Sequence, residues 1–268
     1  MTLSFEFVAA QLRPLGEHQD LALASRALPD GAYTTLRTYR GRVLRLADHV
    51  RRLEGSVALE GCPAQLEAAT VRRAVGLTLS LTRYPESRLR LTFAPPRLFV
   101  SIEPFSPLPE PLYRQGVTAA TLPFHRENPG AKDTRFIATA AGAYARLPDG
   151  VHEGLLLGEG GEILEGLTSN FFGIREGVLR TAEGGALPGI TRELVLEVAA
   201  GLLPISKAAL QRHELPGLSE AFLTSASRGI LPLVRIDEIR VGSGRPGPLT
   251  QGLMARLELL IEREAEPL

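Results

Sequence analysis

The sequence of 268 residues has a single cysteine and no long apolar run. Cys62 cannot form an intrachain disulfide, and its neighbours include no base that would activate a thiol nucleophile, so a structural role is favoured. No window approaches the roughly 20 apolar residues that a membrane span requires. The segment 1–13 lacks the basic start and the continuous apolar stretch of a signal peptide. These absences predict a cytoplasmic protein.

An excess of charge of one sign is also missing. The 30 basic and 30 acidic residues cancel, and no basic run occurs, so neither nucleic acid nor an anionic membrane is favoured as a partner. The apolar content of 44% in a chain of this length can form a sizeable core, as one large domain or two modest ones. We therefore expect a small-molecule substrate, and no metal ion.

Lysine is the scarcest of the basic residues. Of the 30 basic residues, only Lys132 and Lys207 are lysines. Arginine cannot lose its proton at working pH, so chemistry that needs a neutral primary amine has two candidates. Lys132 opens a helical pattern, whereas Lys207 falls on an apparent surface helix. For either residue the alternative is a solvated surface lysine.

The first 106 residues indicate a small α+β domain. Strand-like runs occur at 34–38, 88–93 and 98–102, and helical patterns occur at 47–59 and 64–81. Both element types within about 100 residues are enough for a compact domain of its own.

A proline-rich segment follows, and the pattern then restarts. The segment 107–113 contains too many prolines for a helix or a central strand, so we predict a linker there. The residues 114–268 then form a second, larger domain. Its expected strands are 116–122, 153–158, 162–166, 171–174, 178–181, 221–224 and 233–236, and its expected helices are 134–147, 190–202 and 249–264.

Five segments carry residues that recur together in one enzyme family. In chain order they are Gly31 to Arg37 with His49 to Leu53; Lys132; Glu165 to Phe172; Leu187 to Arg192; and Thr224 to Pro232. Together they resemble the fold-type IV pyridoxal-phosphate (PLP) enzymes, which include branched-chain aminotransferases, D-amino acid aminotransferases and aminodeoxychorismate lyases. The resemblance covers roughly residues 30 to 260.

The resemblance implies a fold class and an assembly. The fold is α/β (α+β), with a small N-terminal α+β domain and a larger C-terminal, β-barrel-like domain with helices. The resemblance also implies pyridoxal 5'-phosphate as the cofactor and a homodimer as the expected assembly.

Two catalytic residues follow from the resemblance. The lysine that matches Lys132 forms the Schiff base with the cofactor aldehyde, and Lys132 lies 33 residues before Glu165, which fits the family spacing. The glutamate that matches Glu165 faces the pyridine nitrogen, where a carboxylate keeps the ring protonated and able to accept electrons. The alternative for Glu165 is a surface glutamate beside a hairpin.

The cofactor phosphate needs hydrogen-bond donors and positive charge. A helix that starts at Ile190 supplies free N–H groups and its dipole, and Thr191 adds a hydroxyl. Leu187 begins the Leu-Pro-Gly turn that leads into this helix. Arg52 matches the family's phosphate arginine, and the His-x-x-Arg-Leu spacing from His49 selects it over the neighbouring Arg51. His49 itself is expected to be structural.

Two positions depart from the family pattern. The last phosphate loop has Ala226 where many relatives have threonine, so the hydroxyl of Ser225 or Ser227, or backbone amides alone, must serve there. The family's Phe-Glu pair is Tyr33-Thr34 in this chain. Specificity therefore cannot be carried over from any one subfamily.

Three residues are candidates for substrate contact. Arg90 and Arg97, on or beside a strand of the small domain, could receive a substrate carboxylate, because the arginine fork matches that group. A surface strand charge is an equal alternative for both arginines. Tyr33 lines the pocket or packs within the small domain.

The leading hypothesis is a class IV aminotransferase that moves an amino group between an amino acid or amine and a 2-oxo acid through a Schiff base at Lys132. The second is an aminodeoxychorismate lyase, which eliminates pyruvate with the same lysine and cofactor. The third is a PLP-binding protein without catalysis. Conversion of the bound cofactor by an amino donor distinguishes the third hypothesis from the others, and pyruvate release identifies the lyase.

Overall fold

The computed structural model describes residues 1–124 and 126–268, and the chain forms two compact units. The first unit combines residues 1–106 with two later segments, 130–139 and 261–268. The second unit contains residues 107–129 and 140–260. The predicted boundaries place both later segments in the second domain, so the two divisions differ there. The difference arises because long-range backbone pairing, which local patterns do not reveal, attaches these segments to the first unit.

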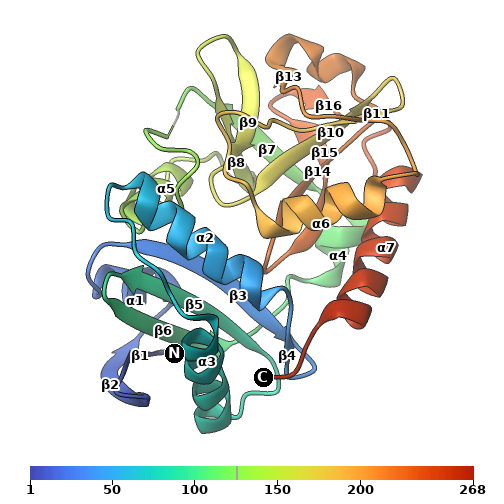
Figure 1. Cartoon of the computed structure of the whole chain (residues 1–268). Helices are drawn as coiled ribbons and strands as arrows, with labels where there is room; N and C mark the ends of the chain where they lie inside the picture. The colour runs from blue at the N-terminus through green and yellow to red at the C-terminus, as the bar shows by residue number, and fades with distance from the viewer. Residues whose placement is uncertain (125) are drawn as a thin grey trace. The chain divides into compact units, whose positions relative to one another are not determined.

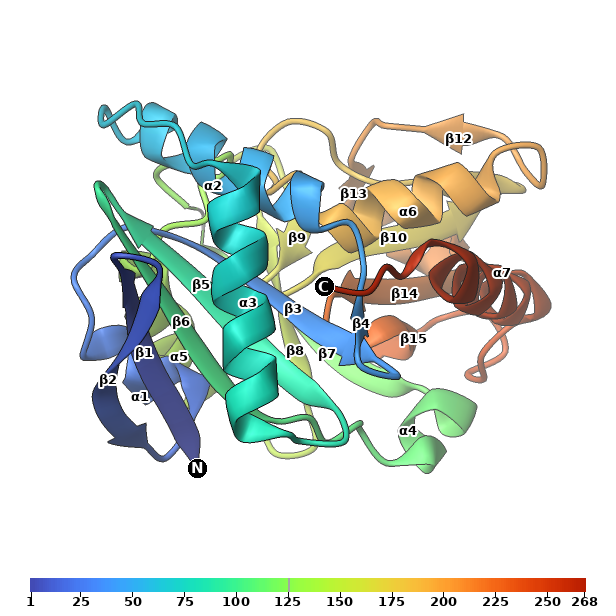
Figure 2. The ribbon, with the colours of Figure 1, turned by 60° about the horizontal axis from the view of Figure 1, so that its bottom comes forward.

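The first unit is built on an antiparallel sheet that has six strands among the described residues. In β5 every second side chain from Leu89 to Phe93 is apolar, and Leu36 of β3 pairs with Leu89, so Leu36, Leu89 and Leu91 point to one face and are buried there. Helices α2 (Leu46–Leu59) and α3 (Ala68–Thr82) cover that face (Figure 2). The strands in spatial order are β2 (Gln11–His18), β1 (Thr2–Val8), β6 (Arg97–Pro104), β5 (Ser87–Ala94), β3 (Ala32–Tyr39) and β4 (Arg42–Val43).

Helix α3 begins later than its sequence pattern predicts. The expected start was residue 64, whereas the helix begins at Ala68. The carboxylate of Glu54 on α2 accepts a hydrogen bond from the Leu66 N–H at 2.7 Å, and this bond holds the preceding segment against α2. A tertiary hydrogen bond therefore delays the helix start.

The sheet of the second unit closes on itself. Strand β9 pairs with both β8 and β10, and this completes a ring of six strands, β10-β14-β15-β7-β8-β9. The closed sheet, together with the α+β first unit, confirms the predicted fold class. The ring strands are β7 (Val117–Leu122), β8 (Glu153–Leu157), β9 (Glu162–Gly166), β10 (Asn170–Arg175), β14 (Glu220–Ser225) and β15 (Gly229–Ile236), and the short strands at its margins are β11 (Val178–Arg180), β12 (Ile205–Ser206), β13 (Leu210–Gln211) and β16 (Ile239–Arg240).

Helices connect the strands of the second unit (Figure 1). Helix α4 (Glu110–Gln115) begins inside the predicted linker, which is therefore not an irregular segment throughout. Pro111 is tolerated because it lies in the first helical turn, where a backbone N–H needs no partner. Helix α6 (Ile190–Ala199) contacts β14. Helix α7 (Pro248–Glu264) ends in the segment 261–268, and the residues of α5 (Arg135–Tyr144) divide between the two units. Helix α1 (Leu21–Arg26) belongs to the first unit.

Within residues 1–124 and 126–268, every helix is too short or too polar to cross a bilayer.

Candidate active site

Backbone hydrogen bonds fix Lys132 on both sides in the first unit. Its carbonyl accepts from the Tyr33 N–H at 2.8 Å, and its own N–H donates to the Ser56 hydroxyl on α2 at 3.1 Å. Two residues on, the N–H of Thr134 donates to the Gly31 carbonyl at 2.9 Å. A Cβ on Gly31 would come within 2.4 Å of a carbonyl oxygen of β5, so glycine is required for this close approach. The segment that carries Lys132 is thereby attached to the start of β3.

The side chain of Lys132 lies over a buried aromatic ring. Its Nζ is 4.9 Å from the centroid of the Tyr33 ring, and the Arg90 guanidinium is 4.7 Å from the same centroid. Cations are attracted to the face of an aromatic ring at such distances. Tyr33 therefore lies beside the predicted catalytic lysine, and Arg90 contacts the same ring.

The two arginines proposed for substrate carboxylate differ in their surroundings. The Nη1 of Arg90 donates to the Leu21 carbonyl at 3.0 Å and to the Ser25 hydroxyl at 2.8 Å, which ties the guanidinium to α1. Arg97 is exposed and pairs with Glu6 at 2.7 Å. Because its guanidinium pairs with a carboxylate of β1, we expect Arg97 to form a surface ion pair of the sheet instead of a substrate contact.

A hydrogen-bond relay connects Arg52 to His49 through Thr34. Arg52 donates to the Thr34 hydroxyl, and that oxygen lies 2.6 Å from Nδ1 of His49. Since arginine only donates, the Thr34 hydroxyl gives its own hydrogen to Nδ1. Burial, and then the charges of Arg52 and Lys132, hold the pKa of His49 well below its usual value. The imidazole is therefore neutral, in keeping with a structural role.

Arg52 is a partly buried cation that makes no ion pair with a carboxylate among the described residues. Its Nε is buried and has no hydrogen-bond partner in that part of the chain, and burial lowers the pKa of the guanidinium to about 10. A buried charge of this kind is stabilised by an anion. Arg51, by contrast, is exposed and pairs with Asp48. An anionic group such as a phosphate fits the surroundings of Arg52.

The neutral His49 predicts a pH-dependent stability. Its pKa is lowered in the folded protein, so the unfolded chain binds more protons below the ordinary value near 6.5, and stability is lost as pH falls from there. Carboxylates with lowered pKa values lose their contribution only at more acidic pH. We expect the melting temperature of the wild type to fall between pH 7 and about 5. The His49→Asn variant, which keeps an acceptor for Thr34, should show a flatter profile; identical profiles would contradict the assignment.

Glu165 is a buried carboxylate at the end of β9 in the second unit, with 3% exposure. One oxygen accepts from the Leu187 N–H at 3.1 Å and lies 3.5 Å from the Asn170 amide nitrogen. The other oxygen pairs with Arg126 at 3.0 Å, and both side chains are buried. These contacts hold the carboxylate in its ionised form and in one orientation.

The turn that precedes α6 is fixed by Asn170. Its amide donates to the Leu187 carbonyl at 2.8 Å, and a Cβ on Gly189 would lie 2.0 Å from its amide oxygen. Gly189 caps α6 without a side-chain hydrogen bond. The first N–H groups of the helix, at Ile190 and Thr191, make no backbone hydrogen bond within the described residues. Such a helix start is suited to an anion.

The remaining predicted cofactor residues lie at the turn between β14 and β15. Ser225 ends β14, and Ala226 begins the turn. The Ser225 hydroxyl accepts from Nε of Arg228 at 3.0 Å. Arg228 itself pairs with the buried Glu153.

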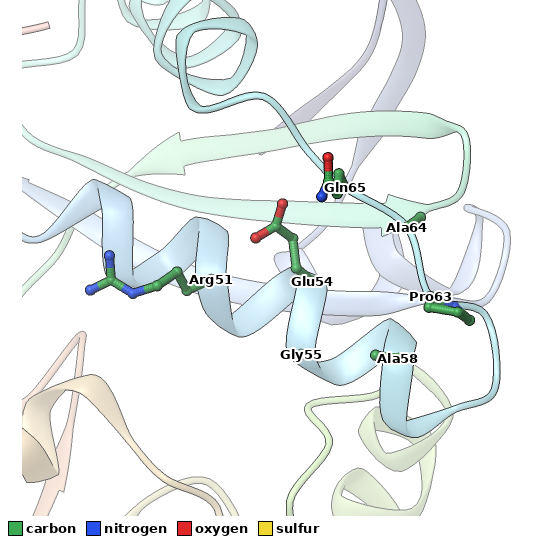
Figure 3. A pocket seen from close by; sticks show the side chains of 7 residues that line it. All are labelled: Arg51, Glu54, Gly55, Ala58, Pro63, Ala64 and Gln65. Carbon is green, nitrogen blue, oxygen red and sulfur yellow. The ribbon is translucent and has the colours of Figure 1, made fainter.

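A surface hollow of about 550 Å³ lies elsewhere on the first unit (Figure 3). Figure 3 shows the residues that line it, which lie on α2 and on the segment that follows the helix, with Gly55 and Ala58 among those on α2. Arg51 lines it, whereas Lys132, Tyr33 and Arg52 do not. The residues that line the hollow are therefore not those of the predicted site.

Sequence reasoning did not identify Arg126, Glu153 or Arg228. Arg126 lies six residues before Lys132, but no local pattern distinguishes it from the other arginines. Arg228 falls inside the fifth recognised segment, and its position directly after Ser225 to Ser227 was the available signal. Glu153 is a charged residue at a strand start, which a pattern alone assigns to the surface.

Known proteins resemble this chain in sequence and in fold. Residues 31–236 match the family model for amino-transferase class IV. A protein of Thermotoga maritima, named a probable branched-chain-amino-acid aminotransferase, is 30% identical over 249 residues, 89% of each chain. The branched-chain aminotransferase of Thermoproteus uzoniensis, solved with norvaline, is 27% identical, with a TM-score of 0.78 over 98% of this chain and 95% of that chain.

A second solved structure shows the same fold at lower identity. The T.th. branched-chain amino acid aminotransferase, solved with pyridoxamine 5'-phosphate, is 22% identical, with a TM-score of 0.80 over 97% of this chain and 94% of that chain. The chain therefore belongs to the class IV aminotransferases. It is a PLP-dependent transferase that acts on small molecules carrying amino and 2-oxo groups.

Proposed function

We propose that this protein transfers the amino group of a branched-chain amino acid to a 2-oxo acid, with Lys132 as the residue that carries the cofactor. The observation that carries the proposal is the attachment of Lys132: its backbone is hydrogen-bonded on both sides, and its amine lies over the Tyr33 ring. A fixed backbone limits the positions that the amine can reach. The donor class is suggested by the names of the relatives, several of which are branched-chain aminotransferases.

The cofactor makes the α-carbon of the substrate acidic, because its ring accepts the electrons of a carbanion. In this proposal the amine of Lys132 carries a proton between that carbon and the cofactor. The Glu165 carboxylate, which is held ionised by Arg126 and by N–H donors, keeps a proton on the ring nitrogen. These two residues are the proposed catalytic pair.

The phosphate is assigned to a guanidinium and to backbone N–H donors. Arg52 offers a half-buried guanidinium without a carboxylate partner among the described residues, and α6 offers the N–H groups of Ile190 and Thr191. Leu187 holds the turn before α6, and Ser225 with Ala226 supplies the last contact. These donors are expected to bind PLP without a covalent bond, since charge-assisted hydrogen bonds contribute roughly 1.5–3 kcal/mol each.

Substrate contacts and assembly are part of the same proposal. Tyr33 is assigned to the substrate side because it lies beside Lys132, with Arg90 next to it. The guanidinium of Arg90 is engaged with α1, so we assign it to positioning Tyr33. A homodimer, as the family resemblance implies, and a location in the cytoplasm complete the proposal.

The proposal is tested by a donor screen on the PLP-loaded enzyme. Amino acids are supplied one at a time with a 2-oxo acid, and formation of the new amino acid is measured together with the visible absorbance of the bound cofactor. We expect leucine, isoleucine or valine to give the fastest amino transfer. Pyruvate release from aminodeoxychorismate without amino transfer would identify the lyase instead, and an unchanged spectrum with every donor would indicate binding without catalysis.

A further inference from the structure

A buried ion pair joins strand β8 to a turn of the second unit. Glu153, at the start of β8, is fully buried, and its carboxylate lies 3.0 Å from Nη2 of Arg228. Arg228 belongs to the turn between β14 and β15, and 18% of its side chain is exposed. A buried carboxylate requires both a counter-charge and hydrogen bonds, because desolvation of the charge is costly. The position of the Arg228 guanidinium is therefore strongly constrained.

Further hydrogen bonds extend the ion pair to the turn between β9 and β10. The Glu153 carboxylate accepts from the Ser169 hydroxyl at 2.8 Å, from the Thr168 hydroxyl at 3.2 Å and from the Tyr144 hydroxyl. Nη2 of Arg228 also donates to the Thr168 hydroxyl at 2.9 Å. The network thus connects the turn that follows Glu165 in the chain with the turn that carries Ser225.

Arg228 leaves the Ser225 hydroxyl able to donate. Its Nε donates to the Ser225 Oγ at 3.0 Å, so that oxygen already accepts a charged N–H. A hydroxyl has one hydrogen to donate, and none of the described residues accepts it from Ser225. Polarisation by the guanidinium strengthens this donor. Ser227, two residues along, makes no side-chain hydrogen bond within the described part of the chain.

Arg228 differs from Arg52 in its charge balance. Glu153 neutralises Arg228, whereas no carboxylate among the described residues pairs with Arg52. An anion would therefore bind Arg52 directly but would gain little from the charge of Arg228. This difference indicates that Arg228 acts through its neighbour.

We propose that Arg228, anchored by Glu153, is a positioning residue that orients the Ser225 hydroxyl to donate to the phosphate of PLP. The inference rests on the proposed function, because it assumes that this turn contacts the cofactor. It decides between the two hydroxyls that flank Ala226 in favour of Ser225. Ala226 lacks the hydroxyl of the threonine that many relatives have at this position. The hydroxyl of Ser225, one position earlier, then takes over its contact with the phosphate.

The first test compares PLP with pyridoxal, which lacks the phosphate. The dissociation constant of each aldehyde is measured by absorbance titration of the cofactor-free protein. The Ser225→Ala variant should bind PLP roughly tenfold to hundredfold more weakly, as expected for loss of a hydrogen bond to a charged group, and should bind pyridoxal as the wild type does. Ser227→Ala should keep the wild-type affinity for PLP.

The second test asks whether Arg228 acts through Ser225. Arg228→Lys keeps a positive charge for Glu153. The lysine lacks the guanidinium fork that reaches both Glu153 and Ser225. We expect it to lose as much PLP affinity as Ser225→Ala, and the double variant to lose no more than either single variant. Thermal unfolding checks that each variant is folded. If Arg228→Lys does not fold, the neutral variant Glu153→Gln/Arg228→Gln takes its place, alone and combined with Ser225→Ala, in the same comparison of PLP affinities.

Three outcomes would overturn the inference: wild-type PLP affinity in Ser225→Ala, the phosphate-specific loss in Ser227→Ala instead, or additive losses in the double variant. Each of these leaves PLP binding by the wild type intact. A wild type that binds neither aldehyde would instead contradict the proposed function. The two failures are therefore distinguishable.

Discussion

Replacing Lys132 by alanine is expected to leave a folded protein that still binds PLP but no longer transfers amino groups. The phosphate donors remain in place, so binding persists without a covalent bond to the chain. Loss of proton transfer by the amine should by itself slow the reaction roughly 10²- to 10⁴-fold. The measurements are PLP retention after gel filtration and the rate of amino transfer with the best donor of the screen.

Lys207 provides the matched control for this variant. It is the other lysine of the chain, and its exposed side chain pairs with Glu183 at 2.7 Å. Lys207→Ala should therefore transaminate at the wild-type rate. Full activity in Lys132→Ala, or activity that disappears only when Lys207 is also replaced, would contradict the assignment.

Glu165→Gln is expected to lower both stability and activity. The amide cannot neutralise Arg126, and removal of one partner from a buried ion pair typically costs about 3–5 kcal/mol. The ring nitrogen also loses its carboxylate, so we expect amino transfer to slow by at least about tenfold, the value of one charge-assisted hydrogen bond. Chemical denaturation and steady-state kinetics measure the two effects separately.

A double variant separates these two effects. In Glu165→Gln/Arg126→Gln no uncompensated charge remains, so we expect much of the stability to return while the rate stays low. Glu165→Asp keeps the charge and should retain more activity than the glutamine variant. A glutamine variant with the wild-type rate would remove Glu165 from the catalytic pair, whatever its stability.

Local patterns predicted most of the fold. Strand-like runs placed the central strands β3, β5 and β6, and the helical periods placed α2, α6 and α7. The edge strand β2 was not predicted, since most of its side chains are exposed and its residues show no regular alternation. The attachment of 130–139 to the first unit was also not predicted, because it depends on hydrogen bonds to β3.

The candidate site was predictable where a residue type is tied to a chemical role. Lys132 was conspicuous because lysine is scarce, and the Leu-Pro-Gly turn indicated a helix start for the phosphate. Arg126 and Arg228 could not be recognised in the same way, because arginine is abundant in this chain and its partner is defined only in three dimensions. Their importance comes from the buried carboxylates that they contact.

The central claim is that Lys132 is the residue that bonds to the cofactor. The most direct measurement is to reduce the PLP-loaded enzyme with borohydride, digest it and locate the cofactor by mass spectrometry of the peptides. We expect the cofactor to be attached to the peptide that contains Lys132 and to no other lysine. Attachment at Lys207, or an active enzyme that yields no labelled lysine, would contradict it.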